Sequence, residues 1–324
     1  MRLSRFSKDQ AMSDYGFAYL SSTTFMGAPR LAEAPERPLG IAGVAYDGAV
    51  TNRPGARFGP EAIRRASLML CDGIHPHFDI SPLDLLADAG DLRTPNTSIE
   101  TMRAALQPQV ENLIAQRRMC WLGGDHSITL PLLRAYRKHY GRPLALLHFD
   151  AHCDTWVDHF GEPSGHGTWV YEAITEGLID PKATVQVGIR SAGVREAREY
   201  VNDMGGKVWT ARMLRGLEKP DELQPVIADI RRRVAAQGNL PIYLSCDIDC
   251  LDPAFAPGTG TPEPGGLTSN QVLTLIEELA DLDWAGMDCV EVAPAYDHAE
   301  LTVNMAANIT WAWLCGQSAR LLRG

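Results

Sequence analysis

The chain lacks paired cysteines, an apolar leader and any long apolar run. Its seven cysteines are an odd number without a C-x-x-C spacing, which argues against a disulfide framework in a chain of 324 residues. The first sixteen residues carry charges but no apolar segment of the kind found in secretory signals. No run of 18 apolar residues occurs, so no transmembrane helix is expected. We therefore expect a cytoplasmic protein with no membrane partner.

The chain also has little positive charge. It carries 30 Lys and Arg against 40 Asp and Glu, for a net charge of −10, and it has no basic run of five residues. Such a surface argues against nucleic acid as a partner and mildly favours small cations. The phosphate-binding motifs G-x-x-x-x-G-K-[ST] and G-x-G-x-x-G are missing as well, so the segment "APGTGTPEPGG" (256–266) is expected to be a turning loop.

Short apolar runs alternate with amphipathic segments from about residue 40 to the end. This alternation predicts repeated βαβ units, a mainly parallel sheet and one three-layer α/β/α sandwich over residues 38–324, preceded by an N-terminal arm over residues 1–37. The expected strands are 39–46, 83–90, 119–124, 144–149, 184–189, 207–211, 242–248 and 285–292. The expected helices are 59–70, 98–117, 127–140, 167–177, 194–203, 221–236, 268–280 and 299–321.

Polar motifs follow three of the expected strands. The segment "DAHCD" comes directly after strand 144–149, "GGDHS" ends strand 119–124, and "CDID" ends strand 242–248. Ligands of open parallel sheets sit beyond the carboxyl ends of the strands, so we expect these motifs to meet at one edge. Acidic groups that meet there would repel one another unless cations neutralised them.

The residue types in these motifs are typical of a site for two divalent ions. A mixed carboxylate and imidazole set suits Mn²⁺, with Ni²⁺, Co²⁺ or Zn²⁺ as alternatives. Two His and four Asp exceed the needs of one tetrahedral zinc and suit two ions about 3.5–4 Å apart. The expected ligands are His126, Asp150, His152, Asp154, Asp247 and Asp249.

Other residues near the motifs are interpreted as structural. Asp125 is expected to cap the helix that follows or to orient His126, because "GGDHSIT" leads into a helix. Cys153 and Cys246 would alternate with the ligand positions and point away from them, as small apolar side chains.

Together, these motifs resemble those of the ureohydrolase family, which contains arginases, agmatinases and guanidino-acid hydrolases. The segments "GGDHS" (123–127), "DAHCD" (150–154) and "SCDIDCLDPAFAPGTGTPEPGGL" (245–267) resemble the family as a whole. "RPGARFGPEAIR" (53–64) and "GMDCVEVAPAYD" (286–297) look most like the agmatinase branch. The resemblance implies an arginase-like sandwich with a sheet of roughly eight strands. It also implies a homotrimer or homohexamer, with a hetero-oligomer containing a paralogous subunit as the alternative.

The resemblance further implies two metal ions per chain, with Mn²⁺ favoured and Ni²⁺ as the main alternative. One ion would be held by His126, Asp150, Asp154 and Asp247, and the other by Asp150, His152, Asp247 and Asp249. Asp150 and Asp247 would therefore bridge the two ions.

The reaction implied is hydrolysis of a guanidino C–N bond to give urea and an amine. Asp154 would hold the attacking hydroxide and pass on its proton. His166, in "SGHGTW", matches the family's proton-shuttling histidine, and Glu291, in "VEVAP", matches its guanidinium-binding glutamate. An imidazole and a carboxylate have the pKa and the bidentate geometry for these roles.

Substrate choice is expected to depend on the loop that follows Asp154. Its candidate substrate contacts are aromatic: Trp156, His159, Phe160 and Trp169. Basic residues that guanidino-acid hydrolases often carry after the H-G-T step are absent, which favours a small cationic, agmatine-like substrate over 4-guanidinobutyrate. Bulky indoles would instead suit guanidine, an alkylguanidine or metformin, unless both Trp are core or subunit-contact residues.

Two other functional classes fit parts of the pattern. A single-zinc amide hydrolase on the same fold, such as a deacetylase, would not need the second ligand set that includes His126. A non-catalytic subunit that stabilises an active partner would not need intact ligands together with His166 and Glu291.

Overall fold

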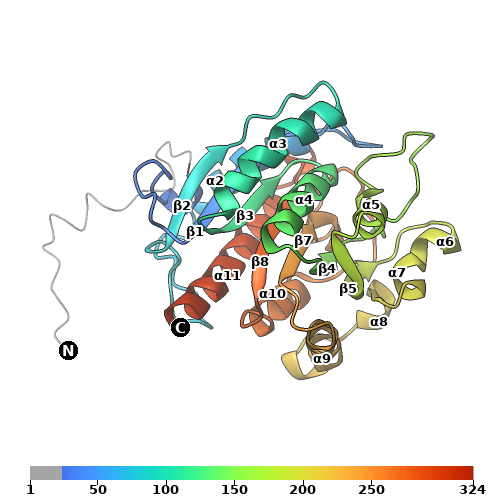
Figure 1. Ribbon diagram of the computed structural model, residues 1–324. Coiled ribbons are helices and arrows are strands. Elements are labelled where there is room, and N and C mark those ends of the chain that lie inside the picture. The colour runs from blue at the N-terminus through green and yellow to red at the C-terminus, as the bar shows by residue number, and fades with distance from the viewer. Residues whose placement is uncertain (1–23, 324) are drawn as a thin grey trace, which may run out of the picture.

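Eight parallel strands form one sheet in the computed structural model, which describes residues 24–323. The strand order is β2-β1-β3-β8-β7-β4-β5-β6 (Figure 1). The strands are β1 (Leu39–Val44), β2 (Leu86–Asp91), β3 (Arg118–Gly123), β4 (Leu144–Phe149), β5 (Ile179–Ile189), β6 (Lys207–Thr210), β7 (Ile242–Asp247) and β8 (Trp284–Val290).

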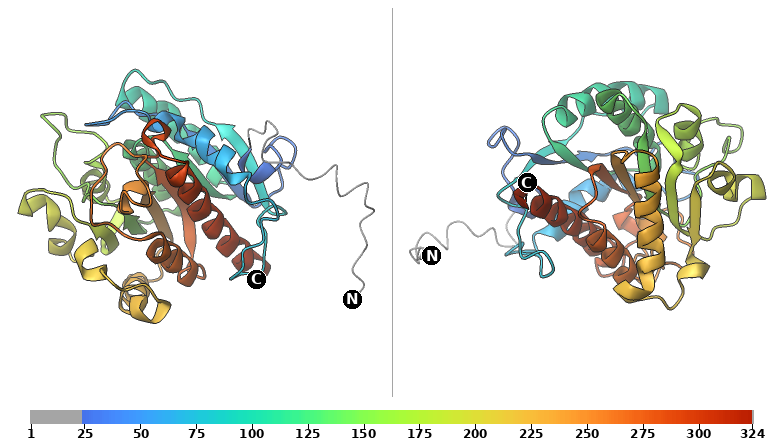
Figure 2. Two further views of the ribbon diagram at one scale, coloured as in Figure 1. Left: turned by 180° about the vertical axis from the view of Figure 1, so that it is seen from behind. Right: turned by 60° about the horizontal axis from the view of Figure 1, so that its bottom comes forward.

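Helices cover both faces of the sheet, which confirms the predicted three-layer sandwich (Figure 2). One face is covered by α2 (Gly59–Ser67), α9 (Pro220–Ala236), α10 (Ser269–Glu278) and α11 (Leu301–Arg323), and the other by α3 (Ile99–Ile114), α4 (Thr129–Tyr140) and α5 (Trp169–Thr175). The short helices are α6 (Arg195–Arg198), α7 (Tyr200–Asp203), α8 (Ala211–Leu214), η1 (Phe25–Gly27), η2 (Ala56–Phe58), η3 (His126–Ile128), η4 (Ile248–Cys250) and η5 (Pro294–Tyr296). Within residues 24–323, no helix combines the length and apolarity needed to cross a bilayer.

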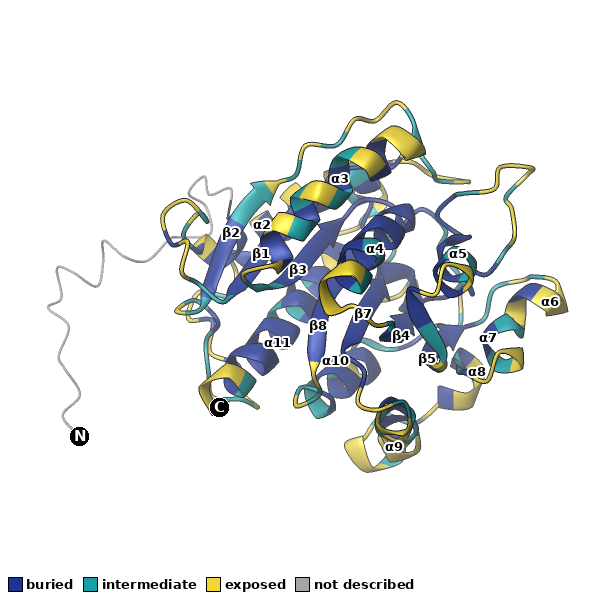
Figure 3. Cartoon of the chain, viewed as in Figure 1, coloured by how far each residue is buried: buried dark blue, intermediate teal, exposed yellow. Residues whose placement is uncertain are grey.

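The sheet lies between two apolar cores. In β4, Ala145, Leu147 and Phe149 pack into one core, whereas Leu144 and Leu146 pack into the other. A parallel strand covered on both faces is apolar on both faces, which is why β4 reads as a continuous apolar run. The strands are buried between helices whose outer faces are exposed (Figure 3).

Two elements differ most clearly from the sequence-based expectation, and α8 was not predicted. Strand β5 begins at Ile179, five residues before the predicted start at residue 184. Pro181 lies in this early part, where the pairing with β4 shifts register between Leu144 and Leu146. Proline is tolerated in a strand at such an irregularity, although in a sequence it signals a turn. The predicted helix 194–203 is divided into α6 and α7.

Part of the predicted N-terminal arm packs against the sandwich. The Phe25 side chain is fully buried, and its backbone N–H donates to Asp88 Oδ2 at 2.8 Å. Asp88 also accepts a hydrogen bond from Arg64 Nε at 2.8 Å. Residues 1–23 of the predicted arm lie outside the described residues.

Candidate active site

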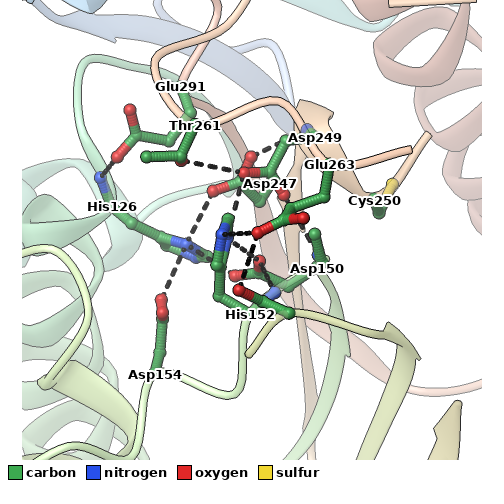
Figure 4. Close-up of polar contacts among 12 residues, drawn as sticks. His126, Asp150, His152, Asp154, Asp247, Asp249, Cys250, Thr261, Glu263 and Glu291 are labelled. Carbon is green, nitrogen blue, oxygen red and sulfur yellow. Dashed lines mark hydrogen bonds and ion pairs between the residues drawn. The ribbon is translucent and has the colours of Figure 1, made fainter. Parts of the chain in front are cut away.

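The carboxyl ends of four neighbouring strands bring the predicted ligands and Glu291 together. Strands β3, β8, β7 and β4 are adjacent in the sheet, and each polar motif follows one of them. Figure 4 shows the side chains pointing toward one another from these strand ends. Most of the groups are buried, so their charges meet in a poorly solvated edge of the sheet.

One group of ligand atoms surrounds His126. Its Nδ1 lies 3.2 Å from Asp150 Oδ2, 3.1 Å from Asp154 Oδ2 and 3.2 Å from Asp247 Oδ2. This nitrogen is buried and makes no hydrogen bond of good geometry within the described residues. Adjacent ligands of an octahedral divalent ion stand about 3 Å apart, because metal–ligand bonds are about 2.1 Å long. The spacing therefore fits a metal ion better than it fits hydrogen bonding.

A second group surrounds His152. Its Nδ1 lies 3.3 Å from Asp150 Oδ1 and 3.1 Å from Asp249 Oδ2. Asp150 thus turns one oxygen to each group, which is the geometry of the predicted bridging carboxylate. Asp247 directs Oδ2 to the first group, and its Oδ1 accepts the N–H of Asp249 at 2.8 Å. The predicted contribution of Asp247 to the second group, around His152, stays a prediction.

Short, capped turns and left-handed residues shape this edge. Asp125 caps η3 by accepting the N–H of Ser127 at 3.0 Å, which confirms its interpretation as a cap. Asp154 and Glu291 have φ values of 51° and 62°, although neither is glycine. A left-handed backbone is costly for such residues and is retained mainly where the surrounding structure requires it, often at functional sites.

Without cations, the buried carboxylates of the site repel one another. Burial and the neighbouring Asp249 and Asp150 raise the pKa of Asp247 well above its ordinary value, and burial also raises the pKa of Asp249. For Asp150, the adjacent imidazoles of His126 and His148 outweigh burial and hold its pKa well below the ordinary value. A divalent cation in each group would remove this repulsion.

The sequence analysis missed His148, the last polar residue of β4. Gln186 Nε2 donates to the Cys153 carbonyl oxygen at 2.7 Å and lies 3.0 Å from His148 Nδ1, which therefore acts as an acceptor. The ring proton then sits on His148 Nε2 and is donated to Asp150 Oδ2 at 2.8 Å. His148 therefore orients the Asp150 carboxylate. A lone histidine in the apolar run "LALLHF" was the signal that could have found it.

A second buried chain orients His126. Its Nε2 lies 2.8 Å from Ser245 Oγ, and Ser245 Oγ donates to Asp288 Oδ1 at 2.7 Å. Asp288 is fully buried and also accepts from Tyr243 and Thr129. This chain leaves His126 Nδ1 directed at the three carboxylates.

Beside the ligands lies a small cavity of about 190 Å³. Trp156 and His159 line it, as the sequence analysis expected of the loop. The other lining residues are Thr51, His152, Asp154, His166, Gly167, Ser191, Ala192, Asp247 and Thr261.

Three predicted substrate contacts are not among the lining residues: Phe160, Trp169 and Glu291. Phe160 is 95% exposed and is absent from the walls of this cavity, because it occupies a left-handed position in an outer turn. Trp169 is fully buried at the start of α5, behind the ligands, with its ring centroid 4.8 Å from that of His126. Its Nε1–H donates to Asp154 Oδ2 at 2.7 Å, so it supports a ligand instead of facing substrate.

The other predicted catalytic residues form a pair. His166 Nδ1 lies 3.0 Å from Glu291 Oε1, which also accepts the backbone N–H of His126 at 2.8 Å. Burial lowers the pKa of His166, but Glu291 and other nearby carboxylates outweigh it and raise the pKa to about 9. The structure therefore brings His166 and Glu291 together, next to the ligand His126.

Comparisons with known proteins agree with this geometry. The agmatinase of Chromobacterium violaceum is 44% identical over 282 residues, which cover 86% of this chain and 83% of that protein. The agmatinase of Edwardsiella ictaluri is 45% identical over 284 residues, covering 86% of this chain and 88% of that protein.

Two solved structures have the same fold. Proclavaminate amidino hydrolase from Streptomyces clavuligerus superposes with a TM-score of 0.85 at 37% identity, covering 94% of this chain and 100% of that one. A hypothetical agmatinase from Burkholderia thailandensis superposes with a TM-score of 0.83 at 39% identity, covering 96% of both chains. The arginase family model matches residues 37–316, so the predicted resemblance is confirmed and the chain belongs to the arginase family.

Proposed function

We propose that this protein is a metal-dependent amidinohydrolase that cleaves the guanidino C–N bond of a small cationic, agmatine-like substrate to urea and an amine. The observation that carries the proposal is Asp150, whose two oxygens face two separate groups of ligand atoms. Membership of the arginase family and about 44% identity to proteins named agmatinase support the same reaction.

The proposed metal site follows the two groups. His126, Asp150, Asp154 and Asp247 would hold one ion, and Asp150, His152 and Asp249 would hold the other together with Asp247. When bound, two divalent cations supply a water molecule of lowered pKa next to the cavity. Mn²⁺ is favoured because its preferred ligands are carboxylate and imidazole, and Ni²⁺ is the main alternative.

The chain's own residues have distinct roles in the proposed reaction. Glu291 is 1% exposed, and its carboxylate would pair with the planar guanidinium. Asp154, held by Trp169 Nε1–H, would accept the proton of the attacking water. His166 would deliver a proton to the leaving nitrogen, because it lines the cavity and its ring pairs with Glu291.

The cavity favours a cationic or neutral tail on the substrate. The described residues that line it include Asp154 and Asp247 but no Lys or Arg that would pair with a carboxylate. This supports agmatine over 4-guanidinobutyrate. Trp156 in the cavity wall keeps guanidine, alkylguanidines and metformin as alternatives, because an indole face attracts methylated cations.

Urea release after reconstitution with Mn²⁺ or Ni²⁺ tests the proposal. The substrates are agmatine, 4-guanidinobutyrate, arginine, guanidine and metformin, with the chelated protein as the control. Fast turnover of agmatine supports the agmatine-like substrate, and turnover of guanidine or metformin alone would replace it. One metal ion per chain would favour the single-zinc amide hydrolase. Urea release only with a co-expressed partner would favour the non-catalytic subunit.

We further propose that the protein works in the cytoplasm as a homotrimer or homohexamer. The resemblance to the family supports this assembly. Light scattering coupled to size exclusion measures the number of copies. A stable complex with a paralogous chain would support the hetero-oligomer instead.

A further inference from the structure

The loop that follows β1 lies against the candidate site and is fixed at several points. Ala49 N–H donates to Asp125 Oδ2 at 2.8 Å, and Asn52 Nδ2 donates to the Gly260 carbonyl oxygen at 2.8 Å. Thr51 lies between these two attachment points and lines the cavity beside the ligands. Its backbone position is therefore set by contacts on both sides.

Thr51 makes two contacts with one nitrogen of His166. Its backbone N–H donates to His166 Nε2 at 3.2 Å, and its Oγ1 lies 2.8 Å from the same nitrogen. A backbone N–H can only donate, so His166 Nε2 must present its lone pair. The ring proton then sits on Nδ1, where Glu291 Oε1 accepts it at 3.0 Å.

The carboxylates around His166 favour the charged ring over this neutral form. The titratable groups that face it are Glu291, Asp125, Asp154 and His159. Burial disfavours the charged ring, and the three carboxylates, considered without Thr51, favour it more strongly. A proton on Nε2 would point at the backbone N–H of Thr51, which cannot accept it, so this N–H opposes the imidazolium form.

The two carboxylate oxygens of Glu291 have different contacts. Its Oε1 accepts from both His126 N–H and His166, whereas Oε2 receives no hydrogen bond within residues 24–323. Gly260 packs beside this oxygen, since a Cβ there would stand 3.7 Å from Oε2 and 2.9 Å from the Arg53 carbonyl oxygen.

We propose that Thr51 is a positioning residue that holds His166 in its neutral Nδ1–H tautomer and leaves Glu291 Oε2 for the substrate guanidinium. This inference rests on the proposed function for the substrate, but the tautomer itself does not depend on turnover. His166 Nε2 then enters the reaction as an acceptor, ready to take up a proton and deliver it to the leaving nitrogen.

Two variants of Thr51 and one control test the contribution of the Thr51 hydroxyl. Thr51→Val keeps the branched shape and the backbone N–H but loses the hydroxyl, whereas Thr51→Ser keeps both contacts with His166 Nε2. Thr97→Val is the matched control, because Thr97 is exposed, lines a neighbouring cavity and does not contact His166. We expect Thr51→Val to lower kcat about tenfold with KM within about twofold, and Thr51→Ser and Thr97→Val to stay near wild type.

Nitrogen NMR of the full chain, labelled with ¹⁵N-histidine and loaded with diamagnetic Zn²⁺, measures the tautomer directly. The His166 signals are identified by their loss in His166→Gln. We expect a protonated Nδ1 and an acceptor Nε2 at neutral pH in the wild type, with a weaker acceptor signature in Thr51→Val.

An imidazolium ring or an Nε2–H tautomer in the wild type would overturn the inference, as would a Thr51→Val enzyme with wild-type kcat. If no guanidine releases urea, the proposed function fails, while the NMR result still decides the role of Thr51.

Discussion

At the scale of single residues, the two histidines of the site belong to different groups. His126 Nδ1 faces Asp154 and Asp247, whereas His152 Nδ1 faces Asp249. Each should therefore be needed for one ion more than for the other.

We expect His152→Ala to reduce the tightly bound metal from two ions to one per chain and to lower kcat/KM at least a hundredfold, because the second group loses its only imidazole. Metal content after gel filtration and urea release measure the two effects. His139→Ala, an exposed histidine in α4, should keep both ions. Retention of two ions by His152→Ala would mean that the second group is not a metal site.

The two tryptophans of the loop should also behave differently. Trp156→Ala opens the cavity wall, so it should change the relative rates with agmatine, guanidine and metformin. Trp169→Phe removes only the donor to Asp154, so it should slow all substrates about tenfold without changing their order. An unchanged substrate profile for Trp156→Ala would remove this residue from the specificity determinants.

At the scale of elements, Arg190 connects the end of β5 to the loop after β7. Its guanidinium donates to the carbonyl oxygens of Asp249, Cys250, Leu251 and Glu263, at distances between 2.6 and 3.2 Å. Glu263 in turn accepts from Ser191 at 2.8 Å and lies 3.9 Å from His152 Nε2. One side chain thus fixes the turn that carries Asp249.

We expect Arg190→Met to weaken metal binding at the second group about tenfold or more, because the carbonyls that it holds would lose their fixed donors. Arg190→Lys should not restore binding, since an ammonium cannot span the same set of oxygens. Competition with a fluorescent chelator measures the affinity. Arg212→Met, an exposed change in α8, is the control. Wild-type affinity in Arg190→Met would show that the loop is held by other contacts.

At the scale of the whole molecule, the two candidate ligand groups lie at the end of the central strands of a single sheet. We propose that residues 38–324 form one catalytic domain, as the sequence analysis expected, and the buried Phe25 packs against the same core. Loss of the bound ions should therefore lower the stability of the whole domain, which should still unfold in one cooperative transition.

Chelation should lower the thermal midpoint by several degrees, and by more at about pH 8 than at about pH 6. The raised pKa values of Asp247 and Asp249 mean that the metal-free fold binds more protons than the unfolded chain. Its stability therefore falls as pH rises above the ordinary aspartate range, whereas metal binding strengthens. Calorimetry with and without chelator measures the difference. A shift that is equal at both pH values would contradict the argument.

The strands and the ligand motifs were predictable because they depend on local pattern. The run "LALLHF" matches β4 residue for residue, since a strand buried on both faces must be apolar throughout. The resemblance of "DAHCD" and "CDID" to the family pointed to the candidate ligand residues, and the parallel sheet explains why they meet. The start of β5 was missed because Pro181 signals a turn unless a neighbouring strand accommodates it.

The sequence by itself therefore determined the fold class, the family and the residues that gather at one sheet edge, because periodicity and motif spacing are properties of the chain. Only the tertiary structure decided that Trp169 supports Asp154, that Phe160 faces outward, and that His148 orients Asp150. These outcomes depend on which side chains from distant segments occupy the same space. The contact between Thr51 and His166, 115 residues apart, is of the same kind.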